Sequence, residues 1–320
     1  MPLLSRSIIL CLFTFLFCRC SQNDGHPQPA GAESLWHGPN KYQIKPENKL
    51  VAYGHDLIEN TAYYLGPAGR VAQISNGMNC QNCHLEGGTL PWGNNYGAVA
   101  STYPKFRERS GSIESIPKRI NDCFERSLNG KPLNDSSYEM KAIVAYMQWL
   151  GMDVKKGKKP NGSGIMDLPL LERAANPEKG KIIYANKCVE CHGATGQGLI
   201  NPEQYGYVYP PLWGEHSFNT GAGLNRLSRM AGYVKNNMPF QKAGWNNPLL
   251  TNEEAWDVAA YILSQPRPVK DVSKDYPNIN KKPFDYSYPP FADSFSLTQH
   301  KFGPFQPVKA FITFVAGQNK

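Results

Sequence analysis

Two short stretches decide the fold of this 320-residue chain. They share the pattern Cys-x-x-Cys-His and read Cys80-Gln81-Asn82-Cys83-His84 and Cys188-Val189-Glu190-Cys191-His192. In this pattern the two thiols add to the vinyl groups of a haem, and the adjacent His supplies a ligand to the iron. A single copy could also be half of a zinc site. Two copies, each behind a predicted helix and before a loop rich in Gly or Pro, predict two covalently bound haem c groups.

The segments around the two motifs repeat the same order of elements. Apolar periodicity predicts helices in the first half over 50–65, 116–128 and 138–150, and in the second half over 177–184, 224–234 and 251–264. This order resembles class I cytochrome c domains. We therefore expect an all-α fold with two such domains in tandem, at 46–153 and 172–266, joined by a linker at 154–171. The Pro-, Tyr- and Phe-rich tail at 267–320 shows no evident helical period and is expected to be extended.

The first twenty residues predict an export signal, because Arg6 precedes an apolar run at 8–17 that is too short to span a bilayer. Two outcomes stay open at its end. Cys20 or Cys18 is acylated, which would anchor the chain to a membrane, or the signal is cleaved and the chain released. Both outcomes place the protein in the periplasm or another extracytoplasmic compartment. Residues 21–45 are polar and rich in Pro and Gly, and are expected to form a tether.

The net charge of the chain limits the kinds of partner that it is expected to bind. The formal net charge is +8, and the basic runs at 155–159 and 281–282 lie in Gly- and Pro-rich connections. Such charges are typical of solvated linkers. Nucleic acid is therefore not an expected partner, whereas a small anionic substrate or an acidic redox protein is compatible with the surplus.

The cysteine count singles out Cys123. Of eight cysteines, three lie in the signal region and four belong to the haem motifs, so Cys123 has no disulfide partner in the folded part of the chain. It stands where the first haem needs its second axial ligand. In the second half, Met238, followed by Pro239, is the best candidate for that position, and Lys235 is a weaker one. The alternatives are an inert buried Cys and a Met that fills a gap in the core.

Basic and hydroxylic residues surround Cys123 in the sequence. Arg119 and Ser127 lie four residues to either side, so a helix would place all three on one face. Arg107 and Arg109 precede them. Guanidinium groups bind tetrahedral oxyanions through paired hydrogen bonds, and cations favour a thiolate. This pattern predicts an anion site beside a reactive sulfur, although such charges also form solvated faces.

The segment Arg119-Ile120-Asn121-Asp122-Cys123-Phe124-Glu125-Arg126-Ser127, with Tyr96-Gly97 and Tyr103-Pro104 upstream, resembles the di-haem c-type thiosulfate dehydrogenases, which also act as tetrathionate reductases. The resemblance covers about 45–266 and extends into the tail at 291–305. It implies that His84 and Cys123 bind a catalytic haem, and that His192 and Met238 bind an electron-transfer haem. It further implies that Arg109 and Arg119 hold the sulfonate of thiosulfate, with Ser127 nearby.

The expected function is the two-electron interconversion of thiosulfate and tetrathionate. Electrons would pass between the two haems and a soluble or membrane-bound redox carrier, such as a small cytochrome c. Two other functions compete. A plain di-haem electron carrier would need neither a free Cys nor its basic neighbours. A subunit of a sulfur-oxidising complex would also use a Cys-ligated haem, with its substrate carried on a partner protein.

Overall fold

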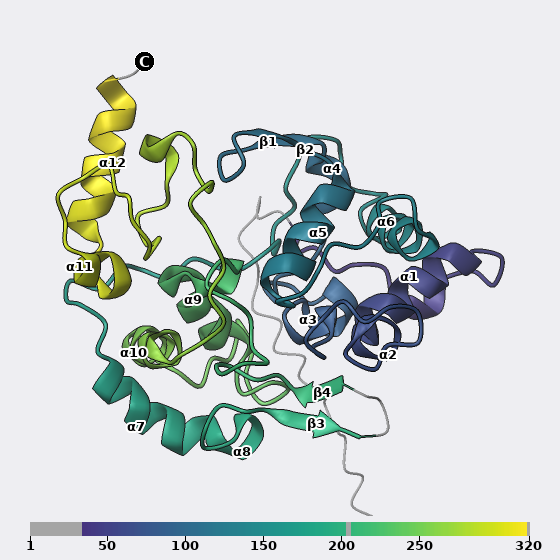
Figure 1. The fold of residues 1–320 in the computed structure, drawn as a ribbon, viewed down its shortest axis with the longest axis horizontal. Coiled ribbons are helices and arrows are strands. Elements are labelled where there is room, and N and C mark those ends of the chain that lie inside the picture. The colour runs from purple at the N-terminus through teal and green to yellow at the C-terminus, as the bar shows by residue number, and fades with distance from the viewer. Residues whose placement is uncertain (1–33, 203–205, 319–320) are drawn as a thin grey trace, which may run out of the picture. The chain divides into compact units, whose positions relative to one another are not determined.

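The computed structural model describes residues 34–202 and 206–318 (Figure 1). The predicted export signal and the candidate acylation sites lie outside the described residues. The first half of the chain contains η1 (Lys41–Gln43), α1 (Lys49–Glu59), α2 (Thr61–Leu65), η2 (Cys80–Asn82), α3 (Leu85–Gly88), α4 (Val99–Thr102), β1 (Lys105–Arg107), β2 (Ser112–Glu114), α5 (Ile116–Arg126) and α6 (Tyr138–Leu150). The second half contains α7 (Pro177–Lys187), α8 (Val189–His192), β3 (Leu199–Asn201), β4 (Gly206–Tyr209), η3 (Gly223–Asn225), α9 (Leu227–Asn237) and α10 (Asn252–Ser264).

The helices that carry the site begin at capping residues that the sequence provides. Ser115 precedes α5 and accepts a hydrogen bond from Lys118 N, and Ser137 caps α6 in the same way. At α10, Thr251 and Glu254 form a capping box. Few strands are present: the two antiparallel pairs, β1 with β2 and β3 with β4, are short hairpins beside the helices. The all-α prediction is therefore confirmed for the main architecture.

Each half is built around one close helix crossing. α1 packs against α6 in the first half, and α7 packs against α10 in the second. A glycine lies at each crossing. A Cβ on Gly54 would lie 2.0 Å from the carbonyl oxygen of Ala142, and one on Gly180 would lie 1.9 Å from that of Asp257. The two glycines therefore let the backbones of the paired helices approach more closely than any side chain would allow.

The predicted tether and linker are partly bound to the first half. The Trp36 ring lies over Gly97, and Trp36 N donates to Asn161 O at 2.9 Å. Trp36 falls within the tether predicted for 21–45, and this large apolar side chain is partly buried on the first half. In the linker, Gly162 O accepts from Trp92 N at 2.7 Å, and Lys158 O accepts from Ser101 Oγ at 2.6 Å.

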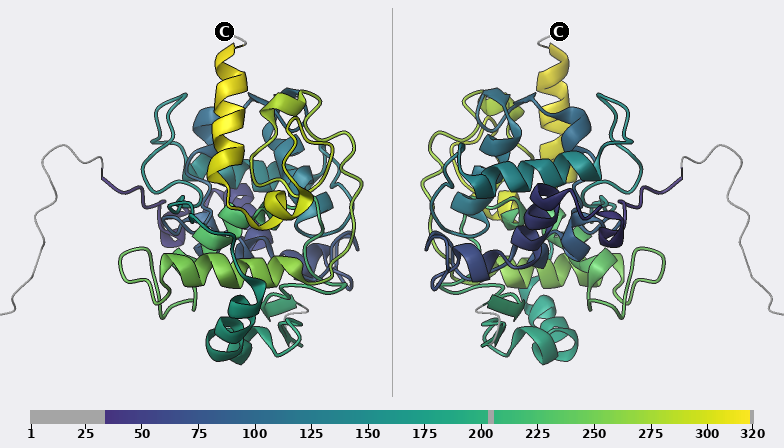
Figure 2. Two further views of the ribbon diagram at one scale, coloured as in Figure 1. Left: turned by 90° about the vertical axis from the view of Figure 1, so that its left-hand side faces the viewer. Right: turned by 90° about the vertical axis from the view of Figure 1, so that its right-hand side faces the viewer.

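The tail crosses both halves and then becomes helical. Asp275 forms a paired ion contact with Arg126 of α5, at 2.7 and 2.8 Å. Asp285 accepts from Arg226 in the second half at 2.6 Å. These buried pairs hold an irregular segment in place, as expected for an extended tail. Its last part differs from the prediction, because α11 (Leu297–Phe302) and α12 (Gln306–Gln318) follow, as the yellow ribbon shows in Figures 1 and 2.

The α12 helix has an apolar period from which it was not predicted. Val308, Phe311, Ile312 and Val315 recur at the helical spacing i, i+3, i+4 and i+7, and Val308 is fully buried. The surrounding Pro and Phe residues obscured this period. Among the described residues, no helix is both long and apolar enough to cross a bilayer.

We predict that Gly180→Ala destabilises the holoprotein. Alanine normally stabilises a helix relative to glycine by up to about 1 kcal/mol. Here its methyl group would push α7 away from α10, and such overpacking costs about 1–3 kcal/mol. The measurement is the midpoint of thermal unfolding. The matched control is Gly223→Ala, because a Cβ at this exposed position meets nothing within 4 Å. Equal midpoints for the two variants would contradict the role of the glycine crossing.

Candidate functional site

The first haem motif and α5 line one cavity in the first half, called the first cavity below. Its volume is about 240 Å³. His84 and Cys123 both line it. His84 Nδ1 lies 2.5 Å from Asn94 O, and the Tyr96 ring stacks on the imidazole at 4.5 Å between centroids. This hydrogen bond fixes the ring and leaves Nε2 available to a metal.

The lining of the first cavity is mainly apolar away from the motif, with Ile58, Val99 and Ile143 among its residues. An apolar cavity with two thiols and an imidazole at one wall fits a covalently attached haem.

The α5 helix places Cys123 on the wall of the first cavity. Buried Asn121 fixes the helix, because its side chain exchanges hydrogen bonds with the backbone of Leu133 at 2.8 and 2.9 Å. One turn before Cys123, Arg119 directs Nη1 to Cys123 Sγ at 3.0 Å. Ser127, one turn after, lines the same cavity. The helical spacing thus brings Arg119, Cys123 and Ser127 together, as the sequence predicted.

The surroundings of Cys123 favour its thiolate. Burial raises the pKa of the thiol, but the Arg119 charge and a hydrogen bond from His84 outweigh burial and lower the pKa to about 6. A thiolate is both the better metal ligand and the better nucleophile. Cys123 is therefore suited to either role.

The structure does not bring Arg109 into the lining of the first cavity. Its Nη1 donates to Gly221 O at 3.3 Å, and its Nε lies 3.9 Å from Asp275 Oδ2, without a hydrogen-bond partner in the described structure. Arg107 lines the cavity instead, together with Lys105 and Lys159. The sequence contained a signal for the shared position of Lys105 and Arg107, because residues two positions apart in a strand point to the same side. The strand itself was not predicted.

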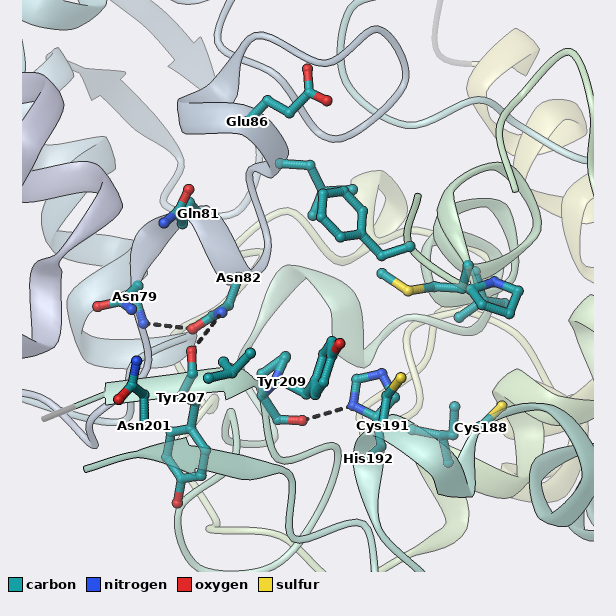
Figure 3. Close-up of a pocket in the computed structure, with 18 of the residues that line it drawn as sticks. Asn79, Gln81, Asn82, Glu86, Cys188, Cys191, His192, Asn201, Tyr207 and Tyr209 are labelled. Carbon is teal, nitrogen blue, oxygen red and sulfur yellow. Dashed lines mark hydrogen bonds between the residues drawn. The ribbon is translucent and has the colours of Figure 1, made fainter. Parts of the chain in front are cut away.

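The second motif lines the larger cavity of about 390 Å³, called the second cavity (Figure 3). His192 Nδ1 lies 2.9 Å from Pro210 O, which again leaves Nε2 available to a metal. Burial lowers the pKa of His192 and so favours the neutral imidazole that binds iron. Met238 also lines this cavity, whereas Lys235 donates to Leu250 O at 2.6 Å and is not among the lining residues.

The two cavities adjoin through the first haem motif. Asn82, between the two thiols of that motif, lines the second cavity and donates to Tyr207 O at 3.2 Å, as Figure 3 shows. The Tyr233 hydroxyl donates to Asn82 O at 3.2 Å. Cys83 and His192 line a further small cavity between them, of about 50 Å³. Sequence reasoning missed these contacts because they join residues more than a hundred positions apart.

The fold and the two donor sets define a di-haem c-type cytochrome. Two family models agree with this class. The model described as "SoxA/TsdA, cytochrome c domain" matches residues 70–155, and the model described as "Cytochrome c" matches residues 177–266. Both matches contain a complete haem motif. The two covalently bound haem c groups predicted from the sequence are thereby confirmed.

Comparison with curated proteins and solved structures identifies the family. The chain is 44% identical over 211 residues to a thiosulfate dehydrogenase of Psychrobacter arcticus, which covers 64% of this chain and 61% of that protein. It is 38% identical to that of Allochromatium vinosum, over 68% of this chain and 80% of the relative. A solved structure, thiosulfate dehydrogenase (TsdBA) from Marichromatium purpuratum, matches with a TM-score of 0.67 and 30% identity, over 75% of this chain and 51% of that chain. The chain belongs to the thiosulfate dehydrogenase family.

We predict that each Cys pair carries one haem independently. Replacing both Cys188 and Cys191 by Ser should leave a protein with about half of the covalent haem, because the first motif keeps its own thiols and His84. The measurement is haem absorbance of the denatured protein together with its intact mass. Wild-type protein is the control. Loss of both haems, or of neither, would show that the two attachments are not separate.

Proposed function

We propose that this chain interconverts thiosulfate and tetrathionate at the first cavity, in an extracytoplasmic compartment. The observation that carries the proposal is the contact between Arg119 Nη1 and Cys123 Sγ at 3.0 Å, in a cavity that His84 of the first haem motif also lines. A cation fixed beside a sulfur nucleophile suits a substrate that has a reactive sulfur at one end and a sulfonate at the other.

The residues that would hold the two haem irons are divided between the two cavities. We propose that His84 and Cys123 hold the iron of the first haem, and that His192 and Met238 hold that of the second. When bound, each haem supplies a site that takes up or releases one electron. Two such sites match the two electrons that the reaction exchanges.

The proposed chemistry of Cys123 balances atoms and electrons. The Cys123 thiolate and the terminal sulfur of one thiosulfate form a sulfur–sulfur bond, and two electrons leave to the redox centres. The terminal sulfur of a second thiosulfate then attacks the thiosulfate sulfur bound to Cys123. Tetrathionate forms, and the Cys123–sulfur bond breaks to restore the thiolate. The reverse sequence begins with attack of the thiolate on tetrathionate and releases one thiosulfate.

Basic residues position the anionic substrate for these steps. Arg119 lies beside the reacting sulfur and is proposed to bind the sulfonate of the first thiosulfate. Ser127, on the same face of α5, offers a hydroxyl donor to it. Arg109 was assigned the same task from the resemblance. In this structure it would first have to leave Gly221 and Asp275 in order to reach a substrate.

The second cavity is proposed to be the exit and entry point for electrons. It adjoins the first motif through Asn82, which would keep an electron path between the two motifs short. The electron partner is proposed to be a soluble or membrane-bound redox carrier, such as a small cytochrome c. Acylation of Cys20 or Cys18 would hold the enzyme close to a membrane-bound carrier.

One competing function has a specific observation in its favour. The first domain matches a family model that names both SoxA and TsdA, so a subunit of a sulfur-oxidising complex would share this domain. The second cytochrome c domain favours the enzyme, because it gives the chain its own electron exit. A plain electron carrier gives no reason for the Arg119–Cys123 contact.

We predict that Cys123→Gly abolishes thiosulfate oxidation and tetrathionate reduction while both haems stay attached. The substitution removes the nucleophile and leaves the attachment motifs intact. The measurements are steady-state rates in both directions and covalent haem content. Lys141→Gly is the matched control, because it introduces the same flexible residue into α6, another helix of the first half, at an exposed position. Undiminished turnover of Cys123→Gly would refute the mechanism.

We predict that Arg119→Gln lowers kcat/KM for thiosulfate by about ten- to a hundredfold, because hydrogen bonds to charged groups contribute about 1.5–3 kcal/mol. Arg229→Gln is the control, since Arg229 lies on the surface of the second half and pairs with Asp167. The measurement is initial rate against thiosulfate concentration. A change in kcat/KM of less than twofold would show that Arg119 does not bind the substrate.

A further inference from the structure

The β1–β2 hairpin directs three charged side chains to one side. The strands are antiparallel, with Lys105 opposite Glu114 and Arg107 opposite Ser112. Because side chains alternate along a strand and directly paired residues share a face, Lys105, Arg107 and Glu114 lie on the same face. The other face carries Phe106 and Ile113, which are 56% and 73% exposed. Lys105 and Arg107 line the first cavity.

A third cation reaches the first cavity from the linker. Lys159 lines it too, and among the described residues neither Lys105 nor Lys159 forms an ion pair with a carboxylate. Lys105 Nζ lies over the Tyr103 ring, 4.8 Å from its centroid. Behind these cations, Glu114 is only 1% exposed, and its oxygens have no hydrogen-bond partner in the described structure. Its nearest cation is Arg107, with Nε at 3.8 Å from Oε2.

The three cations form a charge surplus beside Arg119. Burial lowers the pKa of Lys105, and the charges of Arg107, Arg119 and Lys159 lower it further. One buried carboxylate and the Cys123 thiolate do not balance the four cations that line this cavity. A bound anion would relieve this repulsion, and the donors of Lys105 and Lys159 are available to it.

We propose that Lys105, Arg107 and Lys159 form an outer anion subsite of the first cavity, which binds the sulfonate of the second thiosulfate. This inference rests on the proposed function. Tetrathionate has a sulfonate at each end. Arg119 would bind the inner sulfonate, next to Cys123, and the outer subsite would bind the other. The subsite would also orient the second thiosulfate for its attack on the sulfur carried by Cys123.

The rival ligand for these cations is the pair of propionate groups of the first haem. Propionates and sulfonates are both anions that Lys and Arg bind. The position of the cations favours the substrate over the propionates. Arg119 contacts Cys123, and the charge of Arg119 acts on Lys105. The cations therefore lie on the side of the cavity where the reacting sulfur is. The experiment separates the two ligands.

The test uses two inert probes on the holoprotein, propane-1-sulfonate and propane-1,3-disulfonate, with binding measured by calorimetry. The variant is Lys105→Gln with Arg107→Gln. The control is Lys141→Gln with Lys181→Gln, which removes the same charge from two exposed helix positions. Lys159→Gln is a second, milder variant at an exposed position, in case the double substitution disturbs folding.

We expect the disulfonate to bind wild-type protein more tightly than the monosulfonate does. The Lys105–Arg107 variant should lose about tenfold or more in disulfonate affinity, with the monosulfonate unchanged, and Lys159→Gln should show a smaller loss of the same kind. The control should bind both probes as wild type does.

Equal effects on both probes, or no effect on either, would overturn the outer subsite. A shifted reduction potential of the first haem with unchanged probe binding would assign the cations to the propionates and also overturn it. Because the probes do not react, these results stand even if wild-type protein proves inactive with thiosulfate.

Discussion

The structure depends on the covalent geometry of the Cys-x-x-Cys-His motif. Two thiols and an imidazole must meet one porphyrin, so the chain around each motif has to hold them at one wall of an apolar cavity. The same device orients both histidines, because a backbone carbonyl lies within hydrogen-bond distance of each Nδ1, from Asn94 in one half and Pro210 in the other. The glycine crossings at Gly54 and Gly180 bring the flanking helices close enough to close the cavities.

On this shared scaffold, one difference in the chain separates the two sites. In the first half, the sulfur opposite the motif comes from within α5, so a helical neighbour, Arg119, lies beside it. In the second half, the sulfur of Met238 follows the end of α9, and the lysine that lines the cavity there, Lys187, pairs with Glu254 at 2.9 Å. A thiolate paired with a guanidinium can act as a nucleophile, whereas a thioether can only act as a metal ligand. The repeated fold therefore contains two sites of different character.

The sequence predicted what depends on local spacing. The haem motifs and the shared face of Arg119, Cys123 and Ser127 both follow from residues a few positions apart. It could not predict contacts that the tertiary fold creates. Arg109 and Arg107 look equivalent in the sequence, and only the short hairpin and the tail residue Asp275 separate their positions. The apolar period of α12 predicts a helix, but the Pro and Phe residues around it obscure that period.

The contact of Asn82 with Tyr207 and Tyr233 has a consequence for how such a chain can vary. In a haem motif the two residues between the thiols are usually free to change, since the porphyrin binds only the Cys and His side chains. Here the residue before Cys83 also forms part of the wall of the neighbouring domain's cavity. The two halves are therefore not interchangeable modules. A replacement domain from another cytochrome would have to match its neighbour at this position, so the halves are expected to change together during evolution.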